Sequence, residues 1–400
     1  MSFFKNSQVA KKFKVSHTTV TNWIEASERG QNDLQLATMG KRRVIIDNSH
    51  NTEVIRKLVQ RGKKHSWTSK KVITAAKDEI YNIFSPQQIA ELVTSILSKN
   101  EIPYKFTYLN GGADLWEKHY AISADNENRV VFKENKLILE NIENFLFKFS
   151  RYNKINLFDI GCGNGLPSTT IIDYLLDHNV EVTYTALDIS ERMIQIDKEK
   201  LVNKYPNIPY NSEIIDLDCC NLSKILLEKK GGEDINLLLF LGGTVGNQQD
   251  TSRILSNLRD SMSKNDYLLI GAGLETNEYK YSSTEPHNEF HYKRTTWILD
   301  YLGLNDCYPD TALDTYDQEK REYIRKIPIQ KDVLTSITIE DKHVNLEFKE
   351  GDELLVSRFR RFTEEEIVHD VLSHKFAIDQ FISGLDDSYV LLIVRPKKQL

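Results

Sequence analysis

Asn156-Leu-Phe-Asp-Ile-Gly-Cys-Gly-Asn-Gly165 is the stretch that decides the fold of this 400-residue chain. An apolar run ends in an acid and is followed by glycines at three alternate positions, Gly161, Gly163 and Gly165. A strand that turns tightly into a helix needs residues that tolerate positive φ and close approach, and glycine provides both. The helix-like segment 166–176 follows, so its N-terminus would face any ligand that lies over the turn. The stretch predicts the first strand–turn–helix unit of an α/β domain.

A second apolar run ends in Asp188, twenty-three residues after Gly165. An acid at this position suits the hydroxyl pair of a ribose. The glycine spacing is GxGxG, whereas a dinucleotide fingerprint would read GxGxxG. Strand, glycine turn, helix, strand and acid in this order resemble the S-adenosylmethionine (SAM) site of class I methyltransferases. A glycine turn in some other α/β domain is the alternative.

Three further apolar runs predict strands at 211–219, 235–241 and 267–273. Strands that alternate with helices require right-handed crossovers and a largely parallel sheet, with ligands at the carboxyl ends of the strands. Runs at 376–381 and 388–394 predict a final antiparallel hairpin. The fold class is therefore α/β, with a Rossmann-like class I methyltransferase sheet and an inserted substrate-side α+β region.

The domain boundaries follow from shifts in composition along the chain. They predict a basic winged helix-turn-helix domain at 1–62, a linker at 63–84, a helical cap region at 85–150, a SAM-binding core at 151–275, a substrate-side insertion at 276–375 and a C-terminal hairpin at 376–400.

Charge is unevenly distributed along the chain. Residues 1–77 contain 16 Lys and Arg against 5 Asp and Glu, a net charge of +11, and the remainder carries −17. Such segregation indicates two units with different partners, of which the basic one would meet a polyanion. No membrane-spanning run, secretion signal or paired CxxC motif is present in the sequence, which predicts a reduced, cytoplasmic protein without a membrane partner or metal site.

The basic head reads as two short helices in 7–24, followed by a basic wing strand at 40–46 and a third helix at 51–59. This pattern resembles the winged helix-turn-helix heads of the MerR and excisionase type, which implies duplex DNA as a partner and a possible homodimer. A basic module that packs on the body or on another protein is the alternative. The predicted DNA-binding residues are His17, Thr18, Thr19, Asn22, Lys41, Arg42 and Arg43.

Several motifs in the acidic body point to one family. The segments 108–116, 241–247, 348–353 and 361–366 resemble the histidine-specific methyltransferases of ergothioneine biosynthesis, over roughly residues 100–396. Relatives in that group methylate other amino acids, including a prenylated tryptophan. The resemblance implies an N-methyltransferase with SAM as its cofactor and S-adenosylhomocysteine as its product.

The same resemblance implies roles for individual residues on the substrate side. The tyrosine that matches Tyr108 lies by the reacting amino group, and the asparagine that matches Asn247 holds the amino-acid moiety. Taken alone, Tyr108 could be a half-buried aromatic and Asn247 a turn residue or helix cap. Where the histidine enzymes carry a glutamate and a serine for the imidazole, counting from Gly351 puts Ser357 and Phe359. Histidine is therefore not predicted as the substrate.

The remaining expected contacts are with the cofactor and the substrate. Asp159 and the three glycines would hold the methionine end of SAM, although Asp159 could instead cap the turn. Asp188 would hold the ribose, and Asp218 with Cys219 the adenine, with Asp216 as the alternative to Asp218. Leu241 completes the predicted cofactor site, and Tyr120 and Tyr292 are further substrate-side candidates.

Three functions are compatible with these motifs. The first is a SAM-dependent N-methyltransferase acting on an amino-acid-like small molecule or peptide, with a DNA-binding head. The second is a nucleic-acid methyltransferase. The segment after the fourth strand lacks the (D/N)PP(Y/F/W) pattern of amino-group DNA methylation, and no Pro-Cys dipeptide for cytosine C5 chemistry occurs. The third is a DNA-binding regulator that uses the methyltransferase fold as a SAM or metabolite sensor.

Overall fold

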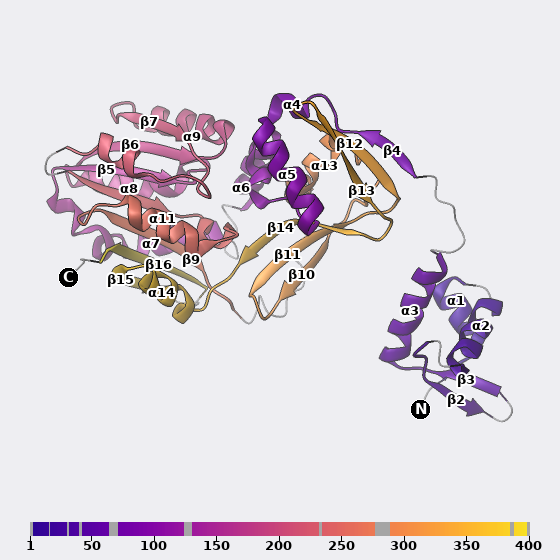
Figure 1. Ribbon diagram of the computed structural model, residues 1–400. Helices are drawn as coiled ribbons and strands as arrows, with labels where there is room; N and C mark the ends of the chain where they lie inside the picture. The colour runs from indigo at the N-terminus through magenta and orange to yellow at the C-terminus, as the bar shows by residue number, and fades with distance from the viewer. Residues whose placement is uncertain are drawn as a thin grey trace. The chain divides into compact units, whose positions relative to one another are not determined.

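The computed structural model describes residues 3–15, 17–29, 32–39, 42–63, 71–123, 130–231, 234–276, 289–384 and 388–397. The chain divides into two compact units, Met1–Lys70 and Lys71–Leu400 (Figure 1). In the described part, no helix is long and apolar enough to cross a membrane.

The first unit combines helices with a small antiparallel sheet of strand order β1-β3-β2. Its apolar core draws Val9, Val20, Ile24, Ile45 and Ile55 from all of the helices and from the central strand of the sheet. The elements are β1 (Phe3–Phe4), α1 (Asn6–Phe13), α2 (His17–Glu28), β2 (Leu36–Met39), β3 (Arg42–Ile46) and α3 (Ser49–Lys63).

Asn51 joins the parts of this unit. Its side chain is fully buried, and its amide nitrogen donates to the carbonyl oxygens of Gln35 and Ile46, both at 2.8 Å. A buried amide is stable only when it is hydrogen-bonded, so these contacts fix the start of α3 against the sheet.

The second unit is built around a seven-stranded sheet of order β15-β16-β9-β8-β5-β6-β7. Strands β5 to β9 are parallel to one another, which confirms the expected parallel sheet, and β16 joins β9 antiparallel. The strands are β5 (Lys154–Ile160), β6 (Glu181–Asp188), β7 (Tyr210–Ile214), β8 (Ile235–Phe240), β9 (Tyr267–Gly273), β15 (Phe376–Ser383) and β16 (Tyr389–Pro396).

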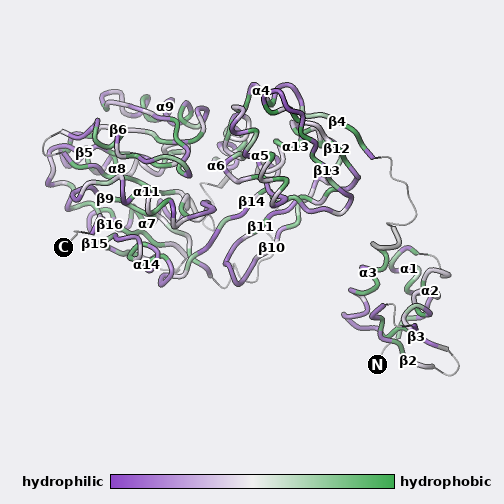
Figure 2. The backbone as a smooth tube through the Cα atoms, in the orientation of Figure 1, coloured by the Kyte–Doolittle hydropathy of each residue, from purple (hydrophilic) through white to green (hydrophobic). Residues whose placement is uncertain are grey.

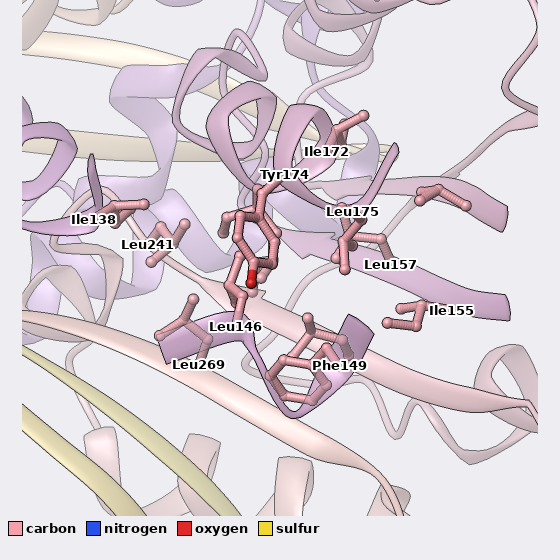
Figure 3. Close-up of a cluster of buried hydrophobic side chains, with 14 of the residues drawn as sticks. Ile138, Leu146, Phe149, Ile155, Leu157, Ile172, Tyr174, Leu175, Leu241 and Leu269 are labelled. Carbon is pink, nitrogen blue, oxygen red and sulfur yellow. The ribbon is translucent and has the colours of Figure 1, made fainter. Parts of the chain in front are cut away.

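Both faces of this sheet are covered by helices, as a parallel sheet requires. Successive residues of β5 point to opposite faces, so Leu157 joins the core under α7 and α8, and Phe158 joins the core under α11 and α14. Figure 3 shows the first of these cores, to which Ile138 and Leu146 of α7 and Leu157 of β5 all belong. The covering helices are α7 (Val130–Leu146), α8 (Leu166–Asp177), α9 (Glu191–Lys204), α10 (Ser223–Glu228), α11 (Thr251–Ser261) and α14 (Glu364–Ser373).

The same pattern is visible along the chain. Every residue of β8 is buried, and apolar stretches (green in Figure 2) run along strands such as β6. A fully buried parallel strand is apolar on both faces, so it shows a continuous run rather than alternation.

A third core of this unit lies beneath two three-stranded sheets, β10-β11-β14 and β13-β12-β4. Helix α5 begins at a regular N-cap, with Ser85 accepting the backbone N–H of Gln88 and with Pro86 in the first turn. The elements are β4 (Val72–Ala75), α4 (Ile80–Ile83), α5 (Pro86–Lys99), the 3-10 helix η1 (Tyr104–Tyr108), α6 (Gly111–Ser123), α13 (Glu289–Tyr301), β10 (Leu313–Asp317), β11 (Glu322–Pro328), β12 (Val333–Ile339), β13 (Lys342–Phe348) and β14 (Glu353–Arg360); two further 3-10 helices, η2 (Phe149–Arg151) and η3 (Thr244–Asn247), follow α7 and β8.

Three of the expected boundaries need correction. The range 63–84, expected to be a linker, contains α4 and also β4, which pairs with β12. Helix α7 of the expected cap and helix α14 of the expected insertion both pack on the central sheet. Periodicity shows that a segment is an amphipathic helix but not which layer it covers, so these assignments required the tertiary structure.

Candidate active site

The glycine turn has the geometry that its sequence predicts. Gly161, Gly163 and Gly165 have φ values of 68°, 55° and 69°, in the left-handed region that only glycine adopts readily. Helix α8 starts directly after Gly165, so its first N–H groups face the space above the turn.

Asp188 lies beside this turn at the end of β6. Its carboxylate accepts the backbone N–H of Gly163 at 3.2 Å and that of Ser190 at 2.9 Å, and 8% of the residue is exposed. Burial raises the pKa of Asp188 to about 6. No ion pair involving Asp188 occurs among the residues that the structure describes. The acid is therefore placed for a cationic, hydroxyl-bearing ligand.

Asp159 is engaged behind the turn rather than above it. The hydroxyl of Ser168 and that of Tyr184 both donate to its carboxylate, the second at 2.8 Å. Tyr184 also donates to Asp197 at 3.1 Å, and Asp197 lies directly behind Gly165. Burial raises the pKa of Asp159 to about 6 and that of Asp197 to about 8. These contacts favour the turn-holding alternative for Asp159, because both hydroxyl donors belong to the surrounding fold.

Helix α6 supplies a contact that sequence analysis did not assign. A Cβ atom added to Gly163 would lie 2.9 Å from the ring of Trp116, so the indole covers the middle of the glycine turn. One residue later, Glu117 accepts the side-chain amide of Asn164 at 2.9 Å. Helix α6 therefore packs over the loop that would hold the cofactor. The aromatic in the 108–116 motif was the available signal.

The segment expected to contact adenine is not the long strand that the sequence predicts. β7 ends at Ile214, so Asp216 and Asp218 lie in the following turn rather than in a strand extending to 219. Lys105 of η1 contacts Asp216 at 2.6 Å and Asp218 at 3.6 Å. Cys219 is exposed beside them. The ammonium group of Lys105 therefore links both candidate adenine-binding acids to η1, the 3-10 helix that also contains Tyr108.

The structure brings together the two main substrate-side candidates. The side-chain amide of Asn247 donates to the hydroxyl of Tyr108 at 3.3 Å, although 139 residues separate them. Asn247 ends η3, which follows β8 and the buried Leu241. A Cβ atom on Gly161 would lie 3.1 Å from the side chain of Thr244, also in η3. Asn247 is thus on the loop that touches the glycine turn, and it bonds to Tyr108 of η1.

Arg294 of α13 is a buried cation beside Tyr108. The sequence did not predict a role for Arg294 at this site. Its guanidinium donates to the hydroxyl of Tyr104 at 2.8 Å and lies 5.3 Å from the ring centroids of both Tyr104 and Tyr108. Only 3% of Arg294 is exposed. Burial raises the pKa of Tyr108 well above its usual value. The phenol is therefore protonated at neutral pH.

The other substrate-side candidates have different neighbours. Tyr120 is buried with its ring 5.0 Å from that of Trp116. Tyr292 donates to the carbonyl oxygen of Pro309, within the insertion. On β14, Phe359 stacks on Tyr323 at 4.9 Å, and Ser357 is buried opposite Arg325. Phe359, one of the two residues expected to face the substrate side chain, is therefore part of a stacked aromatic pair.

The predicted DNA-binding residues are only partly described. On α2, Thr18 and Asn22 are exposed and Thr19 is half-buried. Arg43 of β3 pairs with Glu28 at 3.0 Å and donates to Thr38 at 2.7 Å. Lys41 and the side chains of His17 and Arg42 lie outside the described residues.

The family of the chain follows from a match over most of its length. Residues 89–396 match the family described as histidine-specific methyltransferase, SAM-dependent. The chain belongs to this family, and it is a SAM-dependent methyltransferase.

Three solved structures are similar to part of this chain at low sequence identity. A SAM-dependent methyltransferase from Clostridium acetobutylicum is 10% identical over 71% of this chain and 99% of its own, with a TM-score of 0.40. The glycopeptide N-methyltransferase MtfA in complex with SAM is 12% identical over 63% and 91% of the two chains, with a TM-score of 0.32. The 1,6-didemethyltoxoflavin-N1-methyltransferase of Burkholderia thailandensis is 12% identical over 79% and 92%, with a TM-score of 0.35.

Two curated relatives match over a short stretch. The non-reducing polyketide synthases subA of Metarhizium robertsii and dpmaA of Metarhizium anisopliae are both 34% identical to this chain over 79 residues. That stretch is 19% of this chain and 4% of each synthase, so the chain spans a small part of their length.

The residues at the glycine turn fit the cofactor. SAM carries a ribose and two cationic groups, and the turn offers a buried carboxylate at Asp188 that lacks a basic partner among the described residues. The left-handed φ values of Gly161, Gly163 and Gly165 give the tight turn between strand and helix that such a ligand site needs.

Proposed function

We propose that the chain is an N-methyltransferase that acts on the amino group of an amino-acid-like small molecule or peptide. The observation that carries this proposal is the hydrogen bond between Tyr108 and Asn247, on the loop that touches the glycine turn. The phenol and the amide can both accept hydrogen bonds from a polar amine and donate hydrogen bonds to it. A hydrophobic substrate would leave these polar groups without hydrogen bonds.

The protein's own task is to position a neutral amine, because SAM supplies a methyl group that is already activated. An amine attacks only with a free lone pair, so the substrate must bind as the neutral amine, having left its proton in solvent. We assign to Tyr108 the role of orienting the amine, since its raised pKa keeps the hydroxyl protonated. Asn247 fixes that hydroxyl, and the packing of Trp116 over the turn limits the access of water.

We further propose that the first unit binds duplex DNA. Helix α2 exposes Thr18 and Asn22, which are side chains suited to base edges and phosphates, and β2 and β3 form a hairpin that would act as a wing. The net charge of +11 over residues 1–77 supports binding to a polyanion.

The test is to incubate the full chain with methyl-labelled SAM and, in separate tubes, an amino-acid pool, a cell-extract metabolite pool and duplex DNA. We expect label in a small amine, and we expect Tyr108→Phe to reduce that label. Label in DNA would assign the acceptor to nucleic acid. Calorimetric binding of SAM without transfer in any tube would instead support a sensor.

A further inference from the structure

Glu134 is a buried acid on α7 that no part of the proposed chemistry uses. The residue has no exposed surface, and its two carboxylate oxygens lie 2.9 and 3.0 Å from the backbone nitrogen of Gly242. The hydroxyl of Tyr389, on β16, also donates to this carboxylate. No ion pair to Glu134 occurs among the described residues. A buried carboxylate held only by neutral donors is costly, so it needs a reason beyond packing.

The surrounding backbone leaves space for this carboxylate. Gly271 is a residue of β9, and a Cβ atom built there would overlap both the carboxylate of Glu134 and the hydroxyl of Tyr389. Any larger residue would therefore displace the pair. Three elements, α7, β9 and β16, converge on one acid beneath the loop that follows β8.

The donor that Glu134 holds begins the substrate-side loop. Gly242 and Gly243 have φ values of 69° and 68°, and they turn the chain from β8 into η3. Asn247 ends η3 and donates to Tyr108. The carboxylate of Glu134 thus fixes the first peptide of a short turn whose far end reaches the proposed acceptor site.

We propose that Glu134 is a positioning residue, whose carboxylate holds the 241–247 loop so that Asn247 and Tyr108 meet the acceptor amine. This assignment rests on the proposed function for the role of Asn247. Glu134 acts through the backbone of the loop and does not itself touch the reacting atoms.

The charge of this carboxylate makes the anchor sensitive to pH. Burial, with a smaller contribution from Asp159, raises the pKa of Glu134 to about 7, and the bonds from Tyr389 and Gly242 oppose that shift. Tyr120 also faces the acid, and Arg361 lies near Tyr389. Below its pKa the group gains a proton and becomes a weaker acceptor for Gly242. The loop is therefore held firmly above pH 7 and released as the pH falls.

Hydrogen exchange of the full chain tests the anchor without requiring a known acceptor. We expect Glu134→Gln to speed exchange of the amides in 241–247 by ~10-fold, since a hydrogen bond to a charged group contributes about 1.5 kcal/mol or more. Glu140→Gln is the matched control, because Glu140 is an exposed acid on the same helix. Unchanged exchange in Glu134→Gln would overturn the proposal.

The pH dependence separates positioning from mere packing. After correction for intrinsic exchange rates, protection of 241–247 in the natural protein should rise through pH 7, and Glu134→Gln should remove this transition. Tyr389→Phe should move it to higher pH, because the phenol's bond lowers the pKa of Glu134. A transition that persists in Glu134→Gln, or that Tyr389→Phe leaves in place, would assign the effect to another group. Tyr389→Phe keeps the test decisive even if Glu134→Gln fails to fold.

Labelled transfer to the amino-acid pool links the anchor to turnover. We expect Glu134→Gln to lower the rate of transfer ~10-fold or more while the affinity for SAM, measured by calorimetry, stays within twofold. Undiminished transfer would contradict the positioning role. If the natural protein transfers no label to any amine while the exchange results hold, the proposed function fails and the anchor itself stands.

Discussion

At the scale of single residues, two acids that end neighbouring strands have different surroundings. Asp159 is bonded within the fold by Ser168 and Tyr184, whereas Asp188 accepts backbone N–H groups from the edge of the glycine turn. Sequence alone marks both as acids after apolar runs. Only the contacts distinguish the surroundings of the two acids.

Asp188→Asn should weaken binding of SAM. The substitution keeps the size of the side chain but removes the charge that complements a cationic ligand, so we expect a loss of ~10-fold to 100-fold. Isothermal calorimetry measures this directly. Glu213→Gln, at an exposed acid on β7, is the control and should bind SAM normally. Equal affinity of Asp188→Asn and the natural protein would remove Asp188 from the site.

The affinity for SAM should also depend on pH. Burial raises the pKa of Asp188 to about 6 in the free protein, and a cationic ligand favours the ionised form. Binding is therefore strongest above pH 6 and weakens as the pH falls through 6 and Asp188 gains its proton. Calorimetry in buffers of different ionisation enthalpy should show proton release on binding near pH 6. A flat profile between pH 5 and 8 would contradict this linkage.

Tyr108→Phe should separate turnover from cofactor binding. The substitution removes the hydroxyl that Asn247 fixes but keeps the ring beside Arg294, so we expect transfer to fall by ~10-fold to 100-fold with SAM affinity unchanged. Transfer at the natural rate would show that the phenol does not orient the amine.

At the scale of elements, features decided by neighbouring residues could be predicted from the sequence. Most contacts between residues far apart in the chain could not. The glycine turn, the individual parallel strands and the cap of α5 follow from spacing, because each is decided within about ten residues of sequence. Arg294 reaches Tyr104 across 190 residues, and in sequence it looks like a solvated charge in a polar helix. Glu134 is equally inconspicuous, since its partners lie on β16 and in the loop after β8.

Gly165→Ala should damage the packing of α8 on α9. An added Cβ atom would overlap the carboxylate of Asp197 and approach Leu201 at 2.7 Å, and the φ of 69° strains any other residue. We expect a loss of about 2–4 kcal/mol in the free energy of unfolding, measured by denaturant titration. Gly111→Ala, which meets no atom within 4 Å, should change stability by less than about 1 kcal/mol. Similar losses for the two variants would contradict the packing account.

At the scale of the whole molecule, the chain joins a basic unit to an acidic one. Residues 1–77 carry +11 and the remainder −17, so phosphates should repel the acidic part of the chain, and the proposed binding of DNA should depend on the first unit alone. Substitutions in the first unit should then affect the proposed DNA binding, and substitutions in the second unit should affect methyl transfer.

Arg42→Ala combined with Arg43→Ala should weaken duplex binding. The slope of the logarithm of affinity against the logarithm of salt concentration should become shallower by about one unit for each phosphate that the protein no longer neutralises. Gel-shift titrations at several salt concentrations measure this slope. SAM affinity should not change, because both residues belong to the first unit. Lys224→Ala, an exposed cation of the other unit, is the control and should leave the slope unaltered. An unaltered slope in the double variant would remove the wing from the interface.

Gly271 has a consequence for how this sequence can diverge. The position must stay without a side chain only while an acid at 134 and a phenol at 389 occupy the space above it. A descendant that first loses the acid at 134 can then accept alanine or a larger residue at 271. If residue 271 changed first, its side chain would clash with the acid. Across orthologous sequences the three sites should therefore covary, with substitution at 134 preceding substitution at 271.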